Sequence, residues 1–98
     1  GLLEACVLAL LSTEDSYGYK LTQDVKDVMS ISESTLYPVL KRLQTAGFLE
    51  TYDMPIDGRN RKYYRITSAG KRQQQLYFEE WASYKALIER IFKGVQHK

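Results

Sequence analysis

The stretch SESTLYPVLKRLQTAG, residues 32–47, has the pattern of one complete helix. Ser32 is suited to cap it, because its hydroxyl can accept hydrogen bonds from the first turn, and Ile31 and Leu36 are spaced for a hydrophobic staple. Gly47 suits the left-handed position that follows a helix. Pro38 lacks an N–H and crowds the preceding turn, so we expect a kink or an irregular first turn. Apolar residues at helical spacing predict the buried face: Leu36, Val39, Leu40, Leu43 and Ala46.

Two amphipathic segments precede this helix. Residues 2–11 carry Leu3, Val7 and Leu10 at helical spacing. Residues 12–16 are polar and interrupt the pattern. A second apolar stripe then runs through residues 17–29, formed by Tyr17, Leu21, Val25, Val28 and Met29. The sequence therefore predicts two helices before the third.

Two runs rich in β-branched and aromatic residues follow, at residues 48–55 and 62–67. They flank Asp57-Gly58, a strong signal for a tight turn between paired strands. We therefore expect a β-hairpin with a basic tip at residues 58–61. On the returning strand, alternation places Tyr64 and Ile66 on one face, and Tyr63 and Arg65 on the other.

The charge of the chain is unevenly distributed. The net charge is only +2, but no acidic residue occurs between Gly58 and Phe78. A basic block in an otherwise balanced chain favours an anionic partner. The block consists of Arg59, Arg61, Lys62, Arg65, Lys71 and Arg72.

A long helix is predicted from Ser68 to about Lys93, with Thr67 as its N-cap. Its main apolar seam alternates spacings of four and three, as in a coiled coil. The seam consists of Tyr77, Trp81, Tyr84, Ile88, Ile91 and Val95. A second apolar edge is formed by Phe78, Leu87 and Phe92. We interpret the seam as the interface of a homodimer, and the alternative is a helix that folds back on its own core.

Composition excludes several other classes. The 98 residues fit one compact unit, and no apolar run approaches the ~20 residues of a membrane helix, so we expect a cytoplasmic protein. Cys6, the only cysteine, lies on an apolar stripe and suits a core position. The only histidine, His97, is next to the last residue, a poor position for a metal ligand or a general base. We therefore expect no metal, no cofactor and no enzymatic activity.

The order helix, helix, helix, hairpin, long helix predicts a mainly α fold with a small β-hairpin. This order of elements is typical of a winged helix-turn-helix domain, here residues 1–67, followed by a C-terminal dimerisation helix, here residues 68–98. The third helix would enter a DNA major groove and the wing a minor groove. The candidate contacts on the third helix are Ser34, Thr35, Tyr37, Lys41, Arg42 and Thr45. Those on the wing are Arg59, Arg61 and Lys62.

The chain resembles the PadR-like transcriptional regulators over nearly its whole length. The motifs that carry the resemblance are LLE (2–4), VLALL (7–11), YGY (17–19), STLYP (34–38), LKRL (40–43), GFL (47–49) and RKYYRIT (61–67), followed by Gly70. Ser34, Gln44 and Asn60 depart from the residues common in the family, which are Gly, Glu and Pro.

The resemblance implies a dimeric repressor of the short subgroup, which has a single C-terminal helix and binds a palindromic operator. A member of that subgroup has a tryptophan on its last helix that lines a multidrug-binding pore, and Trp81 is similar to it. This suggests that Tyr77, Trp81 and Tyr84 bind a small aromatic ligand that releases the DNA. The alternatives are a winged-helix protein-interaction module, or a regulator controlled by a partner protein.

Overall fold

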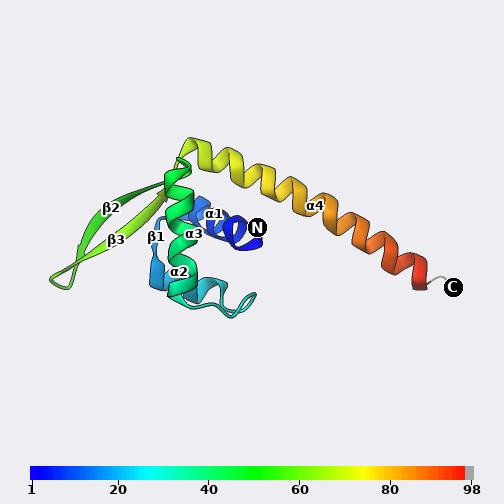
Figure 1. The fold of residues 1–98 in the computed structure, drawn as a ribbon, viewed down its shortest axis with the longest axis horizontal. Coiled ribbons are helices and arrows are strands. Elements are labelled where there is room, and N and C mark those ends of the chain that lie inside the picture. Colours follow the sequence, from blue (N-terminus) through cyan, green and yellow to red (C-terminus); the bar gives the residue numbers. More distant parts are fainter. Residues whose placement is uncertain (97–98) are drawn as a thin grey trace.

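The computed structural model describes residues 1–96, with side chains as far as Gly94. Three helices and a small sheet form a compact head, and a fourth helix projects from it along the 63 Å axis of the molecule (Figure 1). The elements in order are α1 (Leu2–Thr13), β1 (Ser16–Tyr17), α2 (Gly18–Val25), α3 (Glu33–Thr45), β2 (Leu49–Ile56), β3 (Arg59–Ile66) and α4 (Ser68–Gln96). This order confirms the predicted fold class.

The first two helices differ from the prediction at their ends. Helix α1 continues to Thr13, and the hydroxyl of Thr13 donates to the Leu10 carbonyl oxygen. Helix α2 ends at Val25, four residues before the predicted end at Met29. The backbone N–H groups of Val28 and Met29 still bond the Val25 carbonyl, as a turn, and Val28 is 69% exposed. The apolar stripe was therefore correct only as far as Val25.

The sheet has three strands in the order β1-β3-β2, one more than predicted. Ser16 and Tyr17 form β1 and pair with Tyr64 and Tyr63 of β3. Strands β2 and β3 pair antiparallel from the Leu49–Ile66 end to the turn. The sheet is therefore attached to the helices through β1 as well as through the hairpin.

The hairpin turn forms at Asp57 and Gly58, as predicted. Their φ angles of 52° and 77° are both positive, as a type I′ turn requires. The tip is not purely basic, because Asp57 stands in the turn itself. Arg59 directly follows the turn as the first residue of β3. Tyr64 and Ile66 are both buried on the core side of β3, as the alternation predicted.

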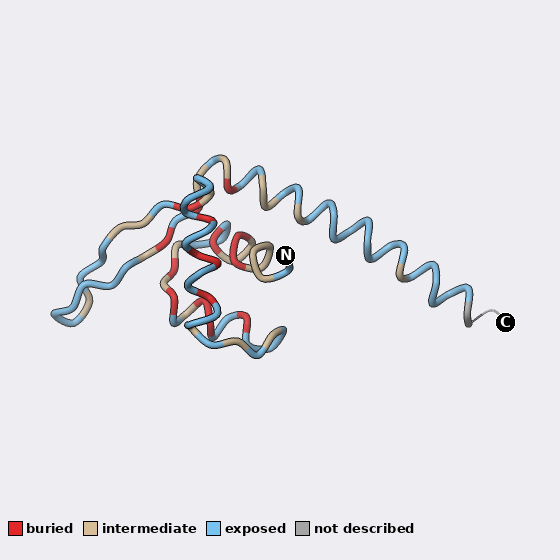
Figure 2. Tube along the Cα trace, in the orientation of Figure 1, coloured by how far each residue is buried: buried red, intermediate tan, exposed pale blue. Residues whose placement is uncertain are grey.

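The core lies where α1, α2 and α3 meet the base of the sheet (Figure 2). Leu8 of α1, Leu21 of α2 and Leu36 and Leu40 of α3 have no exposed surface. Ile31 packs at the edge of this cluster, and Cys6 is half-buried. By contrast, most of α4 is exposed along its length (Figure 2).

Thr67 and Gly70 fix the start of α4. The Thr67 hydroxyl accepts a hydrogen bond from the Gly70 N–H (3.1 Å) and donates one to the Gly47 carbonyl oxygen (2.6 Å). This confirms Thr67 as the N-cap. A Cβ at Gly70 would collide with the carbonyl oxygen of Phe48 and with Ile66. The absence of a side chain at residue 70 therefore lets α4 lie against the base of the wing.

Candidate nucleic-acid interface

Helix α3 presents the predicted polar face to solvent. Its capping differs in detail, because the Ser32 hydroxyl bonds the Ser34 hydroxyl (2.8 Å) and no backbone N–H. The helix runs from Glu33 to Thr45 with Pro38 inside it. All six predicted contact residues of this helix are exposed: Ser34, Thr35, Tyr37, Lys41, Arg42 and Thr45.

Tyr37 is held from two sides although it is 46% exposed. Its hydroxyl donates to the Glu33 carboxylate (3.1 Å), one turn earlier. Its ring lies so close to Gly18 that a Cβ there would be 2.8 Å from the ring edge and from the hydroxyl oxygen. Burial, and then the nearby Glu33, raises the pKa of Tyr37 above its ordinary value, so the phenol remains a hydrogen-bond donor.

Ion pairing separates the cations of α3 and the wing into two groups. Arg42 pairs with Glu4 of α1 (2.9 Å), and Arg65 pairs with Glu50 of β2 (2.8 Å). The bond from Arg42 is the main reason that the pKa of Glu4 falls to about 2. Among residues 1–94, the cations of α3 and the wing without a carboxylate partner are Lys41, Arg59, Arg61 and Lys62.

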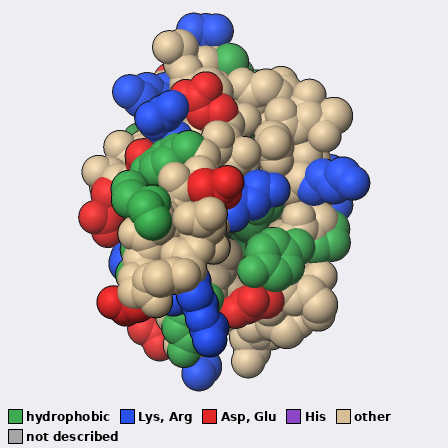
Figure 3. Space-filling model, turned by 90° about the vertical axis from the view of Figure 1, so that its left-hand side faces the viewer, with side chains coloured by type: hydrophobic (Ala, Val, Ile, Leu, Met, Phe, Trp, Pro, Cys, Tyr) green, Lys and Arg blue, Asp and Glu red, His purple; other side chains and the backbone are tan. Residues whose placement is uncertain are grey.

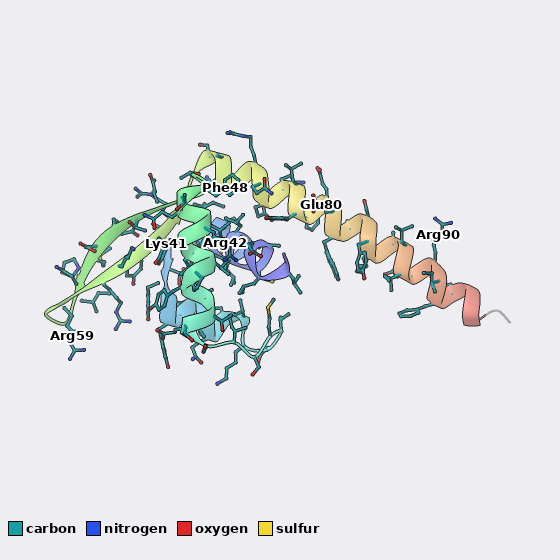
Figure 4. All side chains as sticks on the ribbon, viewed as in Figure 1. Lys41, Arg42, Phe48, Arg59, Glu80 and Arg90 are labelled. Carbon is teal, nitrogen blue, oxygen red and sulfur yellow. The ribbon has the colours of Figure 1, made fainter. Side chains whose placement is uncertain are left out.

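The neighbouring cations of α3 lie on opposite sides of the helix. Lys41 lies on the side toward the wing, and Arg42 lies on the other side (Figure 4). Arg59 lies near the far end of the wing in the same view. The three unpaired wing cations and Lys41 are therefore the charges available to an anionic partner.

The wing is less basic than the sequence of β3 alone indicated. Strand β2 brings acidic residues opposite the cations, because Asp53 is in register with Lys62 and Glu50 with Arg65. Asp57 adds a carboxylate at the turn. Acidic and basic side chains are accordingly interspersed on the face seen from the wing end (Figure 3). The acid-free block between Gly58 and Phe78 thus describes β3 and the start of α4 but not the hairpin as a whole.

A cleft of about 340 Å³ lies between the N-terminal half of α3 and the wing. Arg61 and Lys62 line it from β3, and Glu33 and Tyr37 line it from α3. The Arg61 guanidinium lies 4.4 Å from the centre of the Tyr17 ring. The Lys62 ammonium lies 5.5 Å from the centre of the Tyr64 ring. Cation–π contacts therefore hold both cations at this cleft without neutralising them.

Several residues around the cleft were absent from the predicted contacts. Gln44 lines a second cleft, of about 300 Å³, with Tyr37, Lys41 and Lys62. Helical spacing could have indicated Gln44, since it lies seven residues after Tyr37 on the same side of the helix. The other missed residues are Tyr17, Tyr19 and Glu33. Their proximity to the wing depends on long-range packing and has no local sequence signal.

The three aromatic residues predicted to bind a ligand, Tyr77, Trp81 and Tyr84, line one groove of about 480 Å³ beside α1. The rings of Trp81 and Tyr84 lie 6.2 Å apart, and Trp81 is 52% exposed. Tyr77 is half-buried against the core. An apolar groove of about 260 Å³ separates α1 from α4 and is lined by Leu2, Ala5, Cys6, Tyr77, Phe78 and Trp81. The side chain of Val95, the last residue of the predicted seam, lies outside those that the structure describes.

Two other features bear on the class of protein. None of the helices within residues 1–96 is long and apolar enough to cross a membrane. A three-helix head with a wing and an exposed third helix defines a winged helix-turn-helix, a class that binds DNA through the third helix and the wing. The particular family follows from comparison with known proteins.

Residues 7–76 match the model of the transcriptional regulator PadR-like family, and the chain belongs to that family. It is 36% identical over 92 residues to the transcriptional regulator Rv3488 of Mycobacterium tuberculosis, covering 93% of this chain and 83% of that protein. The PadR-like family consists of DNA-binding transcriptional regulators and not of enzymes.

Solved structures agree with this assignment. The chain matches smu.1704 from Streptococcus mutans with a TM-score of 0.91 and 46% identity, over 95% of this chain and 88% of that one. It also matches Bacillus subtilis PadR in complex with operator DNA, with a TM-score of 0.72 and 28% identity. That match covers 80% of this chain and 47% of the Bacillus protein.

Proposed function

We propose that this protein is a dimeric repressor that binds a palindromic operator in the cytoplasm and is released by a small aromatic ligand. The observation that carries the DNA-binding part is the group of unpaired cations on α3 and the wing, within residues 1–94: Lys41, Arg59, Arg61 and Lys62. Cations without internal partners gain the most when they meet phosphates, because no ion pair must first be broken. The Bacillus relative bound to operator DNA supports the same use of the fold.

In this proposal α3 lies in the major groove. The groove is about 12 Å wide and admits a helix. Ser34, Thr35 and Thr45 supply hydroxyls on the exposed face, and Lys41 supplies a charge. Tyr37 contacts a phosphate at the edge of the groove. Because Arg42 is paired with Glu4, it is a secondary contact that requires the pair to open.

The wing contacts the adjacent minor groove or its phosphates. Arg59 is placed near the end of the hairpin and Arg61 at the cleft nearer the body. The carboxylate of Asp57 at the turn opposes deep insertion of the tip between two phosphate strands. We therefore propose that the sides of the wing, more than its tip, bind the DNA.

The dimer is supported by the exposed apolar surface of α4. Trp81, Tyr84 and Ile91 of the seam are between 52% and 61% exposed. The predicted second apolar edge divides between two sides, because residues advance by about 100° each. Phe78 and Phe92 lie on one side of the seam, and Leu87 lies on the other. Such a wide apolar arc suits a helix that packs against more than one element. A second copy of the chain would supply those packing elements in a dimer.

The ligand part rests on the aromatic groove between α1 and α4. Tyr77, Trp81 and Tyr84 line it beside Leu2 and Ala5 of α1, and flat rings suit planar aromatic molecules. We expect planar aromatic compounds to quench Trp81 fluorescence and to weaken DNA binding. Failure of a broad panel to change Trp81 emission would leave these residues as packing, with control by a partner protein.

Selection of bound duplexes from a random DNA pool tests the function. The proposal predicts enrichment of one sequence with two-fold symmetry, whose half-sites are centred about 34 Å apart or a multiple of that distance. Recovery of no enriched sequence at low salt would favour the alternative, a winged-helix module that binds protein.

A further inference from the structure

The cleft between α3 and the wing contains one acidic side chain among its cations. Glu33, the first residue of α3, lines the same cleft as Arg61 and Lys62. The Tyr37 hydroxyl donates to one oxygen of its carboxylate. Within residues 1–94, neither Arg61 nor Lys62 forms an ion pair with Glu33. Within residues 1–94, no ion pair therefore neutralises the Glu33 carboxylate.

The remaining groups of the cleft suit a single phosphate. Arg61 and Lys62 are held over the rings of Tyr17 and Tyr64 with their charges unpaired. Tyr37 adds a hydroxyl that is fixed by contact with Gly18. Two cations and a hydroxyl donor form the kind of group that contacts DNA phosphates. A carboxylate in this position repels the phosphate and competes with it for the Tyr37 hydrogen.

We propose that the cleft lined by Arg61, Lys62 and Tyr37 binds one backbone phosphate of the DNA, and that Glu33 occupies this site in the free protein. Glu33 thereby lowers the affinity for DNA. When DNA binds, the Tyr37 hydroxyl donates its hydrogen bond to the phosphate instead of to the Glu33 carboxylate. This inference rests on the proposed DNA binding and adds to it a residue that opposes binding.

Glu33→Gln tests the proposal, because glutamine keeps an oxygen that can accept from Tyr37 but has no charge. Binding is measured by fluorescence anisotropy on the selected operator and on a duplex of scrambled sequence. We expect Glu33→Gln to bind both duplexes roughly 3- to 10-fold more tightly at low salt, and the gain to shrink as salt screens the repulsion.

Glu79→Gln is the matched control. It changes the net charge by the same amount, at an exposed position of α4. Among residues 1–94, its only side-chain hydrogen bond is from Gln75. We expect its affinity to remain within about 2-fold of wild type, as for a charge far from the bound DNA. An equal gain in both variants would overturn the proposal, because the effect would then belong to the total charge.

Two further variants separate charge from positioning. The proposal predicts that Glu33→Ala also gains affinity, and that Tyr37→Phe loses more affinity in the Glu33→Gln background than in wild type. If Glu33→Gln binds as wild type does and Glu33→Ala binds more weakly, Glu33 only positions Tyr37 and the proposal is wrong. If wild type binds neither duplex, the proposed function itself fails, and the inference fails with it. Circular dichroism and thermal unfolding confirm that each variant is folded.

Discussion

At the scale of single residues, the partner of a charged side chain decides its role. Lys41 and Arg42 are adjacent on α3, but only Arg42 has a carboxylate partner, Glu4. Glu4 is 38 residues away in the sequence, so no local pattern could have indicated the pair. The sequence correctly predicted that both cations lie outside the core. It could not predict which one was already neutralised.

The pair also predicts a dependence of stability on pH. Arg42 is the main cause that lowers the pKa of Glu4 from 4.5 to about 2. A carboxyl whose folded pKa is lowered stabilises the fold above its unfolded pKa and loses that contribution as pH falls toward the folded value. Glu4→Gln should therefore cost about 1–2 kcal/mol at pH 7, after allowance for the exposure of Arg42.

Urea unfolding at several pH values checks this prediction. The difference in the free energy of unfolding between wild type and Glu4→Gln should shrink between pH 4.5 and pH 2. Glu14→Gln is a suitable control, because Glu14 pairs with Lys20 at the surface. A difference that stays constant over this pH range would show that the Glu4 carboxylate is not stabilised in the fold.

At the scale of elements, the signals read correctly were those contained in a few neighbouring residues. Gly47 has a φ of 84°, as its place after α3 predicted, and Asp57-Gly58 forms the expected turn. The errors came from contacts between distant segments. Strand β1 exists only because Ser16 and Tyr17 meet β3. The end of α2 at Val25 likewise had no Gly or Pro to mark it.

The junction between the wing and α4 depends on Gly70. Gly70→Ala would place a methyl group against the Phe48 carbonyl oxygen and Ile66, so the start of α4 must shift. We expect a loss of about 1–3 kcal/mol in the free energy of unfolding, typical of overpacking. Gly94→Ala is the control on the same helix, because the space around Gly94 is open. It should be neutral or stabilise by up to about 1 kcal/mol.

Chemical denaturation measures the free energy of unfolding of the two variants and so tests this prediction. Equal stability of Gly70→Ala and Gly94→Ala would mean that α4 does not need the close approach to Phe48. In that case the orientation of the long helix relative to the wing is not fixed at this junction.

At the scale of the whole molecule, the head and the long helix differ in how they bury apolar surface. The head has a closed core, whereas α4 leaves large side chains exposed along its length, among them Tyr84, Leu87, Ile91 and Phe92. Exposed apolar patches of this extent mark interaction surfaces. A dimer through α4 would bury them and carry two copies of α3 to the same DNA.

The double variant Ile88→Asp with Ile91→Asp tests the seam. Ile91 is 61% exposed in the protomer, and Ile88 is only half-buried, so the head should still fold. Carboxylates in the seam would be desolvated and face each other across the two-fold axis, which disfavours the dimer. We expect monomers in sedimentation equilibrium and little binding to the selected operator. Dimers of unchanged stability would rule out this seam.

The central claim is that unpaired cations on the wing and α3 bind DNA, and salt dependence tests it most directly. Log affinity decreases with log salt concentration, and the line becomes less steep by about 0.9 for each phosphate that the protein no longer neutralises. Arg59→Ala with Arg61→Ala should therefore flatten the slope by about 2 for each protomer bound. Arg65→Ala, which removes a cation already paired with Glu50, should leave it nearly unchanged. A slope that stays at the wild-type value in the double variant, or that falls equally in Arg65→Ala, would contradict the account.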